Sequence, residues 1–418
     1  MVLSKHCLFL LTLIGFLFFS SCTLTNYPSI QIQANPDQLW SYTDNYAIYQ
    51  SQTIGNHLLV STDRGLIDLR VDFDDPYAQW LIRSKDLILN HSIAKTTEND
   101  RKRYFYLERS SLRFFDIEAS PLELQVKKQS LGSVSTKKYG TFLDGINPSR
   151  HVFSPAGDTL YIARYGNIYA FKPGQNPLDA FHIPNFASHI IADNQYVYYR
   201  AFERERPSSH LFAAVDTKKD HEVWRKLYGP DHQQWYDIVD SFPVLSTDEQ
   251  LYFIVRAYPI TNYDQEGLFI LEHIEKESGK VLDHFELITP HSIGQSIPLG
   301  PIRITDKHLV GEVYAPARLS KLDLSDGKEL WTKSLEHPLL DLIYDIYRDE
   351  WVALLENGGV TTFDPTSGQI IRTINPPEFD AHTFSYGQIH VTEEGYYLGH
   401  LNNREAYTYP RALFFAYR

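Results

Sequence analysis

Short segments in which apolar and polar residues alternate, separated by turn residues, make up most of the chain. Residues 322–331 show the pattern most fully: one strand ends in Asp323, a tight turn carries Gly327, and a second strand ends in Trp331. Alternating runs joined by an Asp-Gly turn predict a β-hairpin. The same spacing from Asp to Gly and on to an apolar run returns at residues 363–371. Repetition of this kind predicts an architecture of repeated units.

The chain divides into units of four short strands, and the last unit is one strand short. Residues 38–41 carry Leu39 and Trp40 in the order of Leu330 and Trp331, and they supply a candidate for the missing strand. A ring of sheets closes when such a strand completes the last sheet through ladder hydrogen bonds. We therefore predict an all-β fold, an eight-bladed β-propeller of four-stranded antiparallel blades closed by an N-terminal strand. Seven blades is the alternative if the second unit forms no blade. The units are residues 46–82, 88–127, 149–182, 189–227, 242–287, 302–331, 342–374 and 388–417.

The first 21 residues are predicted to be a signal peptide and not part of the fold. Lys5 and His6 precede an apolar run over residues 7–19, and small residues then precede Cys22. This order resembles a bacterial lipobox, which implies that Cys22 is lipidated, with palmitate among its acyl chains, and that residues 22–37 form a tether. The alternatives are an ordinary signal peptide or an N-terminal anchor with an incidental cysteine. The apolar run is shorter than a membrane-spanning helix requires.

Composition excludes several classes of fold, site and binding partner. Aromatic residues make up 14% of the 418 residues against a single Met, which suits many half-buried strands. The two cysteines are Cys7 in the signal peptide and Cys22, so the mature domain from residue 38 to 418 contains no disulfide, thiolate metal site or cysteine nucleophile. The net charge of −13 disfavours nucleic acid and anionic lipid headgroups as partners.

Residues 322–331 resemble the repeat of quinoprotein-type (PQQ-like) propellers, which reads approximately Ala-Leu-Asp-x-x-Thr-Gly-Lys-x-x-Trp. Asp216 and Trp224 keep the same outline, although Asp220 stands where the turn glycine of the repeat belongs, and residues 277–282 keep its turn half. The resemblance implies a propeller fold. The adjacent-cysteine ring of many quinoprotein dehydrogenases is absent from this sequence, so we expect no cofactor.

A lipidated propeller of this length is also similar to the BamB family of the machinery that folds outer-membrane β-barrels. That resemblance implies a scaffold that binds another subunit through loops at one face and carries no catalytic residues. The contact residues of the family are not transferable to individual positions of this sequence.

Two residue types, tryptophan and aspartate, recur at fixed positions of the repeat. Packing and turn formation explain them better than a binding function does. A tryptophan that recurs at one repeat position is expected to pack between neighbouring blades and not to form a ligand surface. An aspartate before each turn is expected to accept backbone N–H bonds and not to bind metal. The tryptophans are Trp40, Trp80, Trp224 and Trp331, and the aspartates are Asp116, Asp216, Asp323 and Asp364.

The better candidates for contact residues lie in two connections, residues 202–207 and 231–237. They carry Arg204, Arg206, Trp235 and Tyr236, and Arg, Trp and Tyr are the residue types that most often anchor protein interfaces; the alternative is that these are ordinary solvated loops. Residues 129–148 and the connection from 258 to 267 are two further long loops by the same pattern, and long loops are more often functional than inert.

The sequence contains no zinc motif, nucleophile elbow, phosphate loop or dinucleotide fingerprint. The leading hypothesis is therefore a non-catalytic, lipid-anchored scaffold that mediates protein–protein interactions at the outer membrane, facing the periplasm, in β-barrel assembly. Thr23 after Cys22 favours the outer membrane. The second hypothesis is a periplasmic or surface enzyme, or a glycan- or ligand-binding propeller of the quinoprotein type, which uses the axial funnel.

Overall fold

Every regular secondary-structure element in the part of the chain that the structure describes is a β-strand. In this part there is accordingly no helix long and apolar enough to span a membrane. The computed structural model describes residues 38–44, 48–62, 65–70, 77–83, 93–95, 102–108, 111–119, 124–127, 133–135, 151–154, 158–164, 166–172, 178–183, 187–203, 206–219, 221–228, 236–246, 250–259, 267–289, 301–305, 307–375, 384, 386–402 and 412–417.

These strands form eight antiparallel sheets, of which seven have four strands. The first half of the ring contains β2 (Ile48–Ile54), β3 (His57–Thr62), β4 (Gly65–Arg70) and β5 (Tyr77–Arg83); then β6 (Ile93–Lys95), β7 (Lys102–Glu108), β8 (Ser111–Ala119), β9 (Leu124–Lys127) and β10 (Ser133–Ser135); then β11 (His151–Phe153), β12 (Leu160–Arg164), β13 (Asn167–Phe171) and β14 (Leu178–His182); then β15 (Ala187–Ala192), β16 (Tyr196–Glu203), β17 (Arg206–Asp216) and β18 (His221–Tyr228).

The second half repeats the arrangement. It contains β19 (Tyr236–Leu245), β20 (Leu251–Pro259), β21 (Gly267–Ile274) and β22 (Val281–Thr289); then β23 (Ile302–Ile304), β24 (His308–Ala315), β25 (Arg318–Asp323) and β26 (Glu329–Ser334); then β27 (Leu339–Asp345), β28 (Glu350–Leu355), β29 (Val360–Phe363) and β30 (Ile370–Ile374); and finally β31 (Tyr386–Val391), β32 (Tyr397–Asn402), β33 (Ala412–Tyr417) and β1 (Gln38–Asp44).

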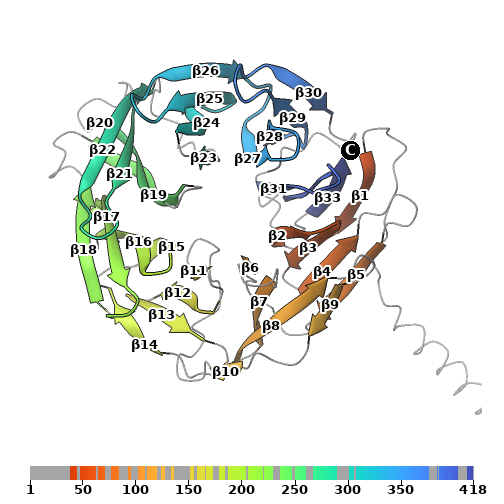
Figure 1. The fold of residues 1–418 in the computed structure, drawn as a ribbon, viewed down its shortest axis with the longest axis horizontal. Helices are drawn as coiled ribbons and strands as arrows, with labels where there is room; N and C mark the ends of the chain where they lie inside the picture. Colours follow the sequence, from red (N-terminus) through yellow and green to blue (C-terminus); the bar gives the residue numbers. More distant parts are fainter. Residues whose placement is uncertain are drawn as a thin grey trace, which may run out of the picture.

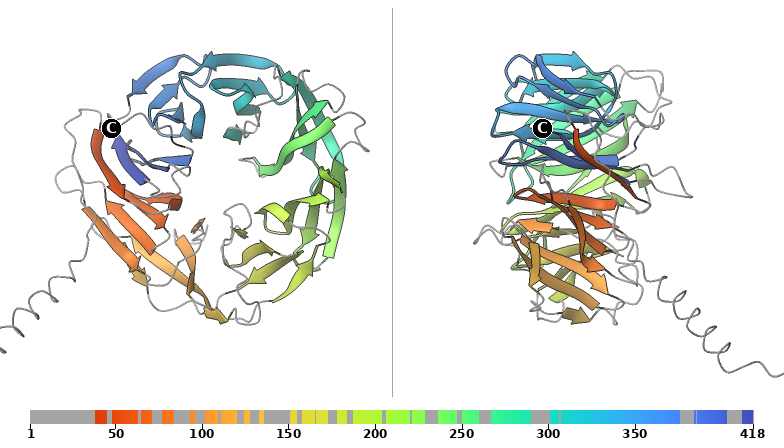
Figure 2. Two further views of the ribbon diagram at one scale, coloured as in Figure 1. Left: turned by 180° about the vertical axis from the view of Figure 1, so that it is seen from behind. Right: turned by 90° about the vertical axis from the view of Figure 1, so that its right-hand side faces the viewer.

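The sheets follow one another around a ring, with the first strand of each sheet nearest the centre and the last on the rim (Figure 1). Seen edge-on, the ring is a flattened disc (Figure 2). This arrangement confirms the predicted all-β propeller. The number of blades in the whole chain, eight or seven, stays a prediction.

The N-terminal strand completes the last sheet, as the sequence predicts. β1 pairs with β33 in antiparallel register from Gln38 opposite Tyr417 to Asp44 opposite Ala412. The closing sheet, which we define as β31, β32, β33 and β1, therefore joins both ends of the chain by ladder hydrogen bonds. Without β1, the row of N–H and C=O groups on β33 would be an open edge.

The second unit departs from the prediction. β10 lies inside residues 129–148, which the sequence indicates are a loop, and it pairs with residues 111–113 of β8. β9 pairs with residues 116–119 of the same strand, so two short strands share one edge of β8. A three-residue strand is too short to produce a recognisable alternation, because one period of the pattern already takes two residues.

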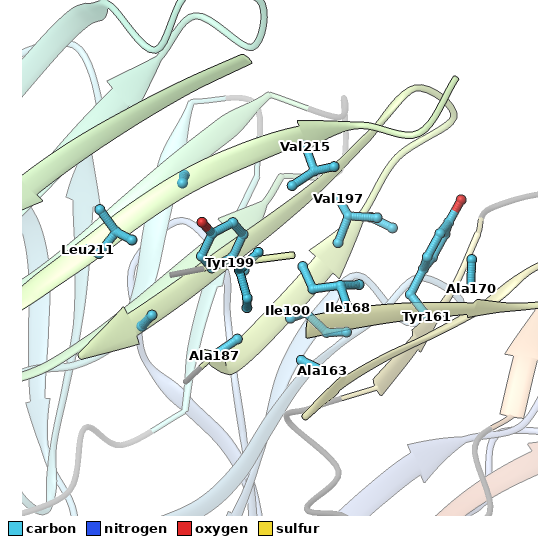
Figure 3. Packing of buried hydrophobic residues seen from close by; sticks show 14 residues of the cluster. Tyr161, Ala163, Ile168, Ala170, Ala187, Ile190, Val197, Tyr199, Leu211 and Val215 are labelled. Carbon is cyan, nitrogen blue, oxygen red and sulfur yellow. The ribbon is translucent and has the colours of Figure 1, made fainter. Parts of the chain in front are cut away.

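The hydrophobic core lies between neighbouring sheets. Figure 3 shows one such layer, in which Tyr161 and Ile168 meet Ile190, Val197 and Val215 across the interface of the β11–β14 and β15–β18 sheets. The second and third strands are covered on both faces, and every residue of β3 and β29 is buried. Fourth strands on the rim are exposed for much of their length, as β30 is.

A contact between an aromatic ring and a turn glycine recurs between consecutive sheets on the rim. The aromatic ring on the fourth strand of one sheet packs against a turn glycine of the next sheet, where an added Cβ would come within 2.5–3.1 Å of the ring. These glycines have positive φ, which a side chain rarely adopts. The pairs are Trp224 with Gly279, Phe285 with Gly327, and Trp331 with Gly368.

The packing interpretation of the tryptophans is confirmed where their side chains are described. Trp224 and Trp331 are buried, and their indole N–H groups donate to the carbonyls of Lys276 and Pro365 in the next sheet, at 2.7 and 3.2 Å. Trp80 is half-buried against the core beside the closing sheet. The side chain of Trp40 lies outside the described residues.

Candidate interaction surface

The two faces of the disc carry different kinds of connection. Because the strands are antiparallel, the connections between first and second and between third and fourth strands lie on one face, which we call the tight-turn face. The connections between second and third strands, and from each sheet to the next, lie on the other, which we call the long-loop face. The turns of the first kind include residues 193–195, 275–280, 324–328 and 346–349. Connections of the second kind join strand ends on the other face, such as Tyr228 to Tyr236, Pro259 to Gly267, Thr289 to Ile302 and Asn402 to Ala412.

The predicted contact residues belong to the long-loop face. Arg206 begins β17 and is paired with Glu203 at the end of β16, and Tyr236 begins β19 and is paired with Pro259. The strand order therefore brings both positions to the long-loop face. The two sheets that carry them, β15–β18 and β19–β22, are neighbours in the ring (Figure 1). Arg204, Trp235 and the side chains of Arg206 and Tyr236 lie outside the described residues.

The predicted connections are shorter than the sequence suggests. Phe202 and Glu203 still belong to β16, and Arg206 already belongs to β17, so the turn itself is confined to residues 204–205. Tyr236 and Asp237 are likewise strand residues of β19. The alternation of apolar and polar residues that predicts a strand is lost at these strand ends, because charged and aromatic residues occupy them. Their backbones nevertheless pair with the neighbouring strand.

A buried polar cluster lies directly beneath these strand ends. It joins β15 and β16 to β17 and to β19 of the next sheet, and Arg200 is its centre. Arg200 donates from Nη1 to Ser188 Oγ at 2.6 Å and from Nε to Ser241 Oγ at 3.3 Å. Its guanidinium lies 4.1 Å from the centre of the half-exposed Phe202 ring. His210 follows Arg206 on β17, and Ser241 follows Tyr236 on β19, so the cluster fixes both strands from below.

The protonation of His210 is set by burial and by the neighbouring guanidinium. Together they lower the pKa of His210 to about 3, so the ring is neutral at physiological pH. Ser241 Oγ lies 2.7 Å from Nδ1 and Arg200 Nη2 lies 3.3 Å from the same atom. Nδ1 therefore accepts, and the ring proton sits on Nε2.

This serine–histidine pair does not have the arrangement of a nucleophile and its base. Ser241 is completely buried, and the charged group that contacts His210 is a cation, whereas a catalytic imidazole is normally oriented and stabilised by a carboxylate. The cluster is instead a rigid support: it holds the edge that carries Phe202, Arg206 and Tyr236 by hydrogen bonds that cross from one sheet to the next.

A second buried group supports the same face between the β23–β26 and β27–β30 sheets. Glu312 of β24 accepts from the backbone N–H groups of Ala317 and Leu339, at 2.8 and 2.9 Å. Burial raises the pKa of Glu312 to about 7, with the charge of Glu356 acting in the same direction and Arg256 opposing it. The carboxyl therefore joins a turn of one sheet to the first strand of the next and titrates near neutral pH.

Polar side chains also connect the inner strands around the closure. Gln388 of β31 accepts from the N–H of Ser51 in β2 at 2.8 Å, and Ser51 Oγ lies 2.8 Å from ring nitrogens of both His390 and His400. On the other side of β31, Asp341 accepts from the N–H of Ile389 at 3.0 Å. These contacts continue the closure that β1 makes on the rim.

The repeated aspartates stabilise turns, with one exception. Asp116 lies within β8, opposite Arg103 and Lys127, so the prediction that it precedes a turn is wrong. Among the described residues, no group of three His, Cys, Asp or Glu side chains is placed to hold a metal ion. The turn contacts are Asp216 with the N–H groups of Lys218 and Lys219, Asp323 with that of Ser325, and Asp364 with those of Thr366 and Ser367.

Sequence reasoning missed the buried charged residues that support the long-loop face. They occupy the second strands of their sheets, close to the end that meets this face, at Arg200 in β16, Arg256 in β20 and Glu312 in β24. An alignment of the second strands would have shown a charged residue within three otherwise apolar segments. Burial of a charge requires hydrogen-bonded partners, so this pattern is a usable signal.

Comparisons with known proteins identify similar folds. No family model matches the chain, and no curated protein matches it. The crystal structure of BamB from Moraxella catarrhalis matches over 93% of this chain and 100% of its own, with a TM-score of 0.52 and 12% sequence identity. The fold is a β-propeller similar to that of BamB. At this identity the similarity concerns the fold alone.

A second solved structure has lower similarity. The WD40 β-propeller domain of Doa1 matches over 88% of this chain and 96% of its own, with a TM-score of 0.42 and 10% identity.

Proposed function

We propose that this protein is a non-catalytic, lipid-anchored scaffold that binds another protein of the bacterial envelope through its long-loop face. The anchor is Cys22, the location is the periplasmic side of the outer membrane, and the assembly it serves is the one that folds outer-membrane β-barrels. The observation that carries the proposal is the pair of strand ends, on β17 and β19, that place Arg206 and Tyr236 on the long-loop face above the buried, hydrogen-bonded cluster around Arg200.

The geometry of these strand ends suits protein recognition. Interface hot spots are aromatic and Arg residues held on preorganised backbone and surrounded by polar groups. Arg206 and Tyr236 stand at strand ends on the same edge of adjacent sheets, and the side chain of Phe202 is 41% exposed beside them. The buried Arg200 and Ser241 join the two sheets, so the edge needs little ordering when a partner binds.

The direction of the tether is consistent with this use. Gln38 begins β1 opposite Tyr417, and Tyr417 is itself opposite Tyr397, which follows the turn between β31 and β32. The chain therefore enters the ring on the tight-turn face. An anchor that leaves from one face leaves the opposite face available for a partner.

Co-purification from membranes solubilised in mild detergent tests the proposal. The full chain with an affinity tag is expected to recover barrel-assembly subunits, and the double variant Arg206→Glu/Tyr236→Ala is expected to lose them. Lys218→Glu/Lys328→Glu is the matched control, because both lysines lie in turns of the tight-turn face. Recovery of the chain alone contradicts the role in barrel assembly, and equal recovery by all three proteins contradicts the assignment of the face.

Lipidation is tested separately by mass spectrometry of the mature N-terminus and by incorporation of a palmitate analogue. Cys22→Ser is expected to abolish incorporation and to release the protein from the membrane fraction. Retention of the label by this variant contradicts the proposed anchor.

A further inference from the structure

One turn of the tight-turn face differs in character from its counterparts. The turn between β27 and β28, residues 346–349, presents Ile346 with 72% and Tyr347 with 51% of their surfaces exposed, and the nearby Tyr344 is 38% exposed. The equivalent turns of other sheets carry polar residues, such as Asn56, Asn194 and Gln195, Lys307, and Glu393 and Glu394. The repeat therefore supplies its own comparison, and only this turn, among the first-to-second turns that the structure describes, places two large apolar side chains in water.

The backbone of this turn is fixed. The buried carboxylate of Asp345 accepts from the N–H groups of Tyr347 and Arg348, at 2.9 and 3.1 Å. Arg348 also forms an ion pair with Asp345 at 3.1 Å and donates to the carbonyl of Gly395 at 2.6 Å. The turn is thus held by Asp345 and by the carbonyl of Gly395 while the side chains of Ile346 and Tyr347 are exposed.

The turn lies beside the point where the chain enters the ring. Gly395 belongs to the turn between β31 and β32 of the closing sheet, and Gln38 of β1 enters that same sheet on the same face. Figure 1 shows β27 and β28 next to the closing sheet. Residues 22–37 reach at most about 58 Å when fully extended, so a lipid on Cys22 limits how far this face can lie from a membrane.

We propose that the turn formed by Ile346 and Tyr347 inserts into the interfacial region of a phospholipid bilayer and orients the disc with its tight-turn face toward the membrane. The proposal rests on the lipid anchor of the proposed function and adds a second membrane contact to it. Tyrosine suits the boundary between headgroups and acyl chains, because its ring is apolar and its hydroxyl remains hydrated.

The charges around the turn identify the lipid surface. Asp349 is the last residue of the turn and Glu350 begins β28, Glu393 and Glu394 lie in the neighbouring turn, and the guanidinium of Arg348 is paired with Asp345. An anionic membrane would be repelled by this arrangement. The contact is therefore apolar in origin, and a zwitterionic surface is the expected partner.

Vesicle sedimentation tests the insertion without the native lipid. The mature chain, residues 22–418, has Cys22 as its single thiol, which allows one tetradecyl chain to be attached through a maleimide. A single acyl chain of this length binds bilayers only weakly and reversibly, so a second contact is measurable. With phosphatidylcholine vesicles, Ile346→Ser/Tyr347→Ser is expected to weaken binding ~10-fold, and Ile346→Trp is expected to strengthen it.

Controls distinguish insertion of this turn from general surface hydrophobicity and from self-association. Leu282→Ser/Leu330→Ser removes two exposed leucines from rim strands β22 and β26 and is expected to change binding less than ~2-fold. Addition of phosphatidylglycerol is expected to weaken binding, and salt is expected not to. Equal partitioning of all variants overturns the proposal. Loss of a dimer by the double serine variant in sedimentation velocity without vesicles also overturns it, because the turn would then contact a second copy.

The outcome is independent of the scaffold test. The acyl chain is supplied chemically and no partner protein is present, so a negative result here leaves the co-purification experiment unaffected, and a failed co-purification leaves this measurement valid.

Discussion

On the tight-turn face the same few residue types recur in consecutive sheets, whereas the connections between second and third strands on the long-loop face range from two residues between β16 and β17 to nine between β32 and β33. The recurring group comprises an aspartate that accepts backbone N–H bonds, a glycine with positive φ, and an aromatic ring from the preceding sheet. The turn at residues 364–368 shows it in full, with Asp364, Gly368 and the ring of Trp331. On the opposite face, the sheets are joined by buried groups such as Arg200 and Glu312, each with a different set of partners.

The two faces differ in what their contacts do: those of the tight-turn face join the sheets, and those of the long-loop face position individual connections. A repeated local motif joins three consecutive pairs of sheets by the same kind of contact, independently of what the other face carries. Buried charged groups with individual partners fix particular loops at particular places, which suits recognition of one partner. The turn at Ile346 and Tyr347 is the instructive exception, because it keeps the aspartate-based backbone of the repeat but replaces its polar residues.

Of the changes considered, deletion of β1 is expected to lower the free energy of unfolding most. Removal of residues 23–44 with the signal peptide retained exposes the edge of β33, and loss of the ladder from Gln38 to Asp44 is expected to cost at least about 4 kcal/mol of unfolding free energy, given roughly 1 kcal/mol for each net hydrogen bond. Thermal and urea unfolding measure the effect.

The matched control is deletion of residues 23–37, which keeps β1 and removes only the tether. Its stability is expected to equal that of the full chain. Unchanged unfolding of the longer deletion would show that the ring does not depend on β1.

The glycine on the tight-turn face is expected to be the next most sensitive position. Gly368 has a φ of +66°, and an added Cβ would lie 2.6 Å from the Trp331 ring. Gly368→Ala therefore combines backbone strain with overpacking and is expected to destabilise by about 2–4 kcal/mol. Gly55 has a φ of +54° and nothing within 4 Å of its added Cβ, so Gly55→Ala is expected to cost only about 1 kcal/mol. Equal urea midpoints for the two variants would remove the ring contact as the cause.

The sequence was sufficient for features that depend on local spacing. The packing of Trp224 and Trp331 and the turn role of Asp216, Asp323 and Asp364 follow from residue type and interval within one unit. The position of β1 follows from the number of strands in each unit, because the last unit is one strand short. The error at Asp116 has the same origin, because a single Asp before a turn-like stretch resembles the repeat even where the strand continues through it.

The support of the candidate site depends on contacts between distant segments and was not predictable in this way. Ser188, Arg200 and Ser241 meet from three strands of two sheets, and Glu312 reaches Leu339 across a sheet interface. Their partners are set by how adjacent sheets stack, which the alternation within each strand does not encode. The positions of Arg206 and Tyr236 on one edge were likewise visible only once the sheets were in order.

The buried carboxyl on the long-loop face predicts a pH effect absent from the tight-turn face. The pKa of Glu312 is raised in the folded protein from 4.5 to about 7, so folding retains a proton that the unfolded chain releases. Its contribution to stability is complete below pH 4.5 and is lost as pH rises to 7, by roughly 3 kcal/mol. Urea unfolding of the wild type and of Glu312→Gln from pH 4.5 to 8 measures this effect. The unfolding free energy of the wild type is expected to fall relative to that of the variant as pH rises, because the variant carries no titrating group at this position. A constant difference would show that Glu312 titrates in its ordinary range.

The smallest expected effect compares the same substitution on the two faces. Ser241→Ala removes the group that donates to Nδ1 of the neutral His210 and accepts from Arg200, and loss of a buried hydrogen-bonding group is expected to cost about 1–2 kcal/mol. Ser325→Ala removes a hydroxyl that donates to Asp323 at 2.6 Å, but this turn is exposed and water replaces the bond, so a cost below about 0.5 kcal/mol is expected. Urea unfolding of both variants under identical conditions makes the comparison. Equal destabilisation would mean that the cluster under the long-loop face contributes no more to the ring than a solvent-exposed turn, and that rigidity of the edge with Arg206 and Tyr236 must come from another source.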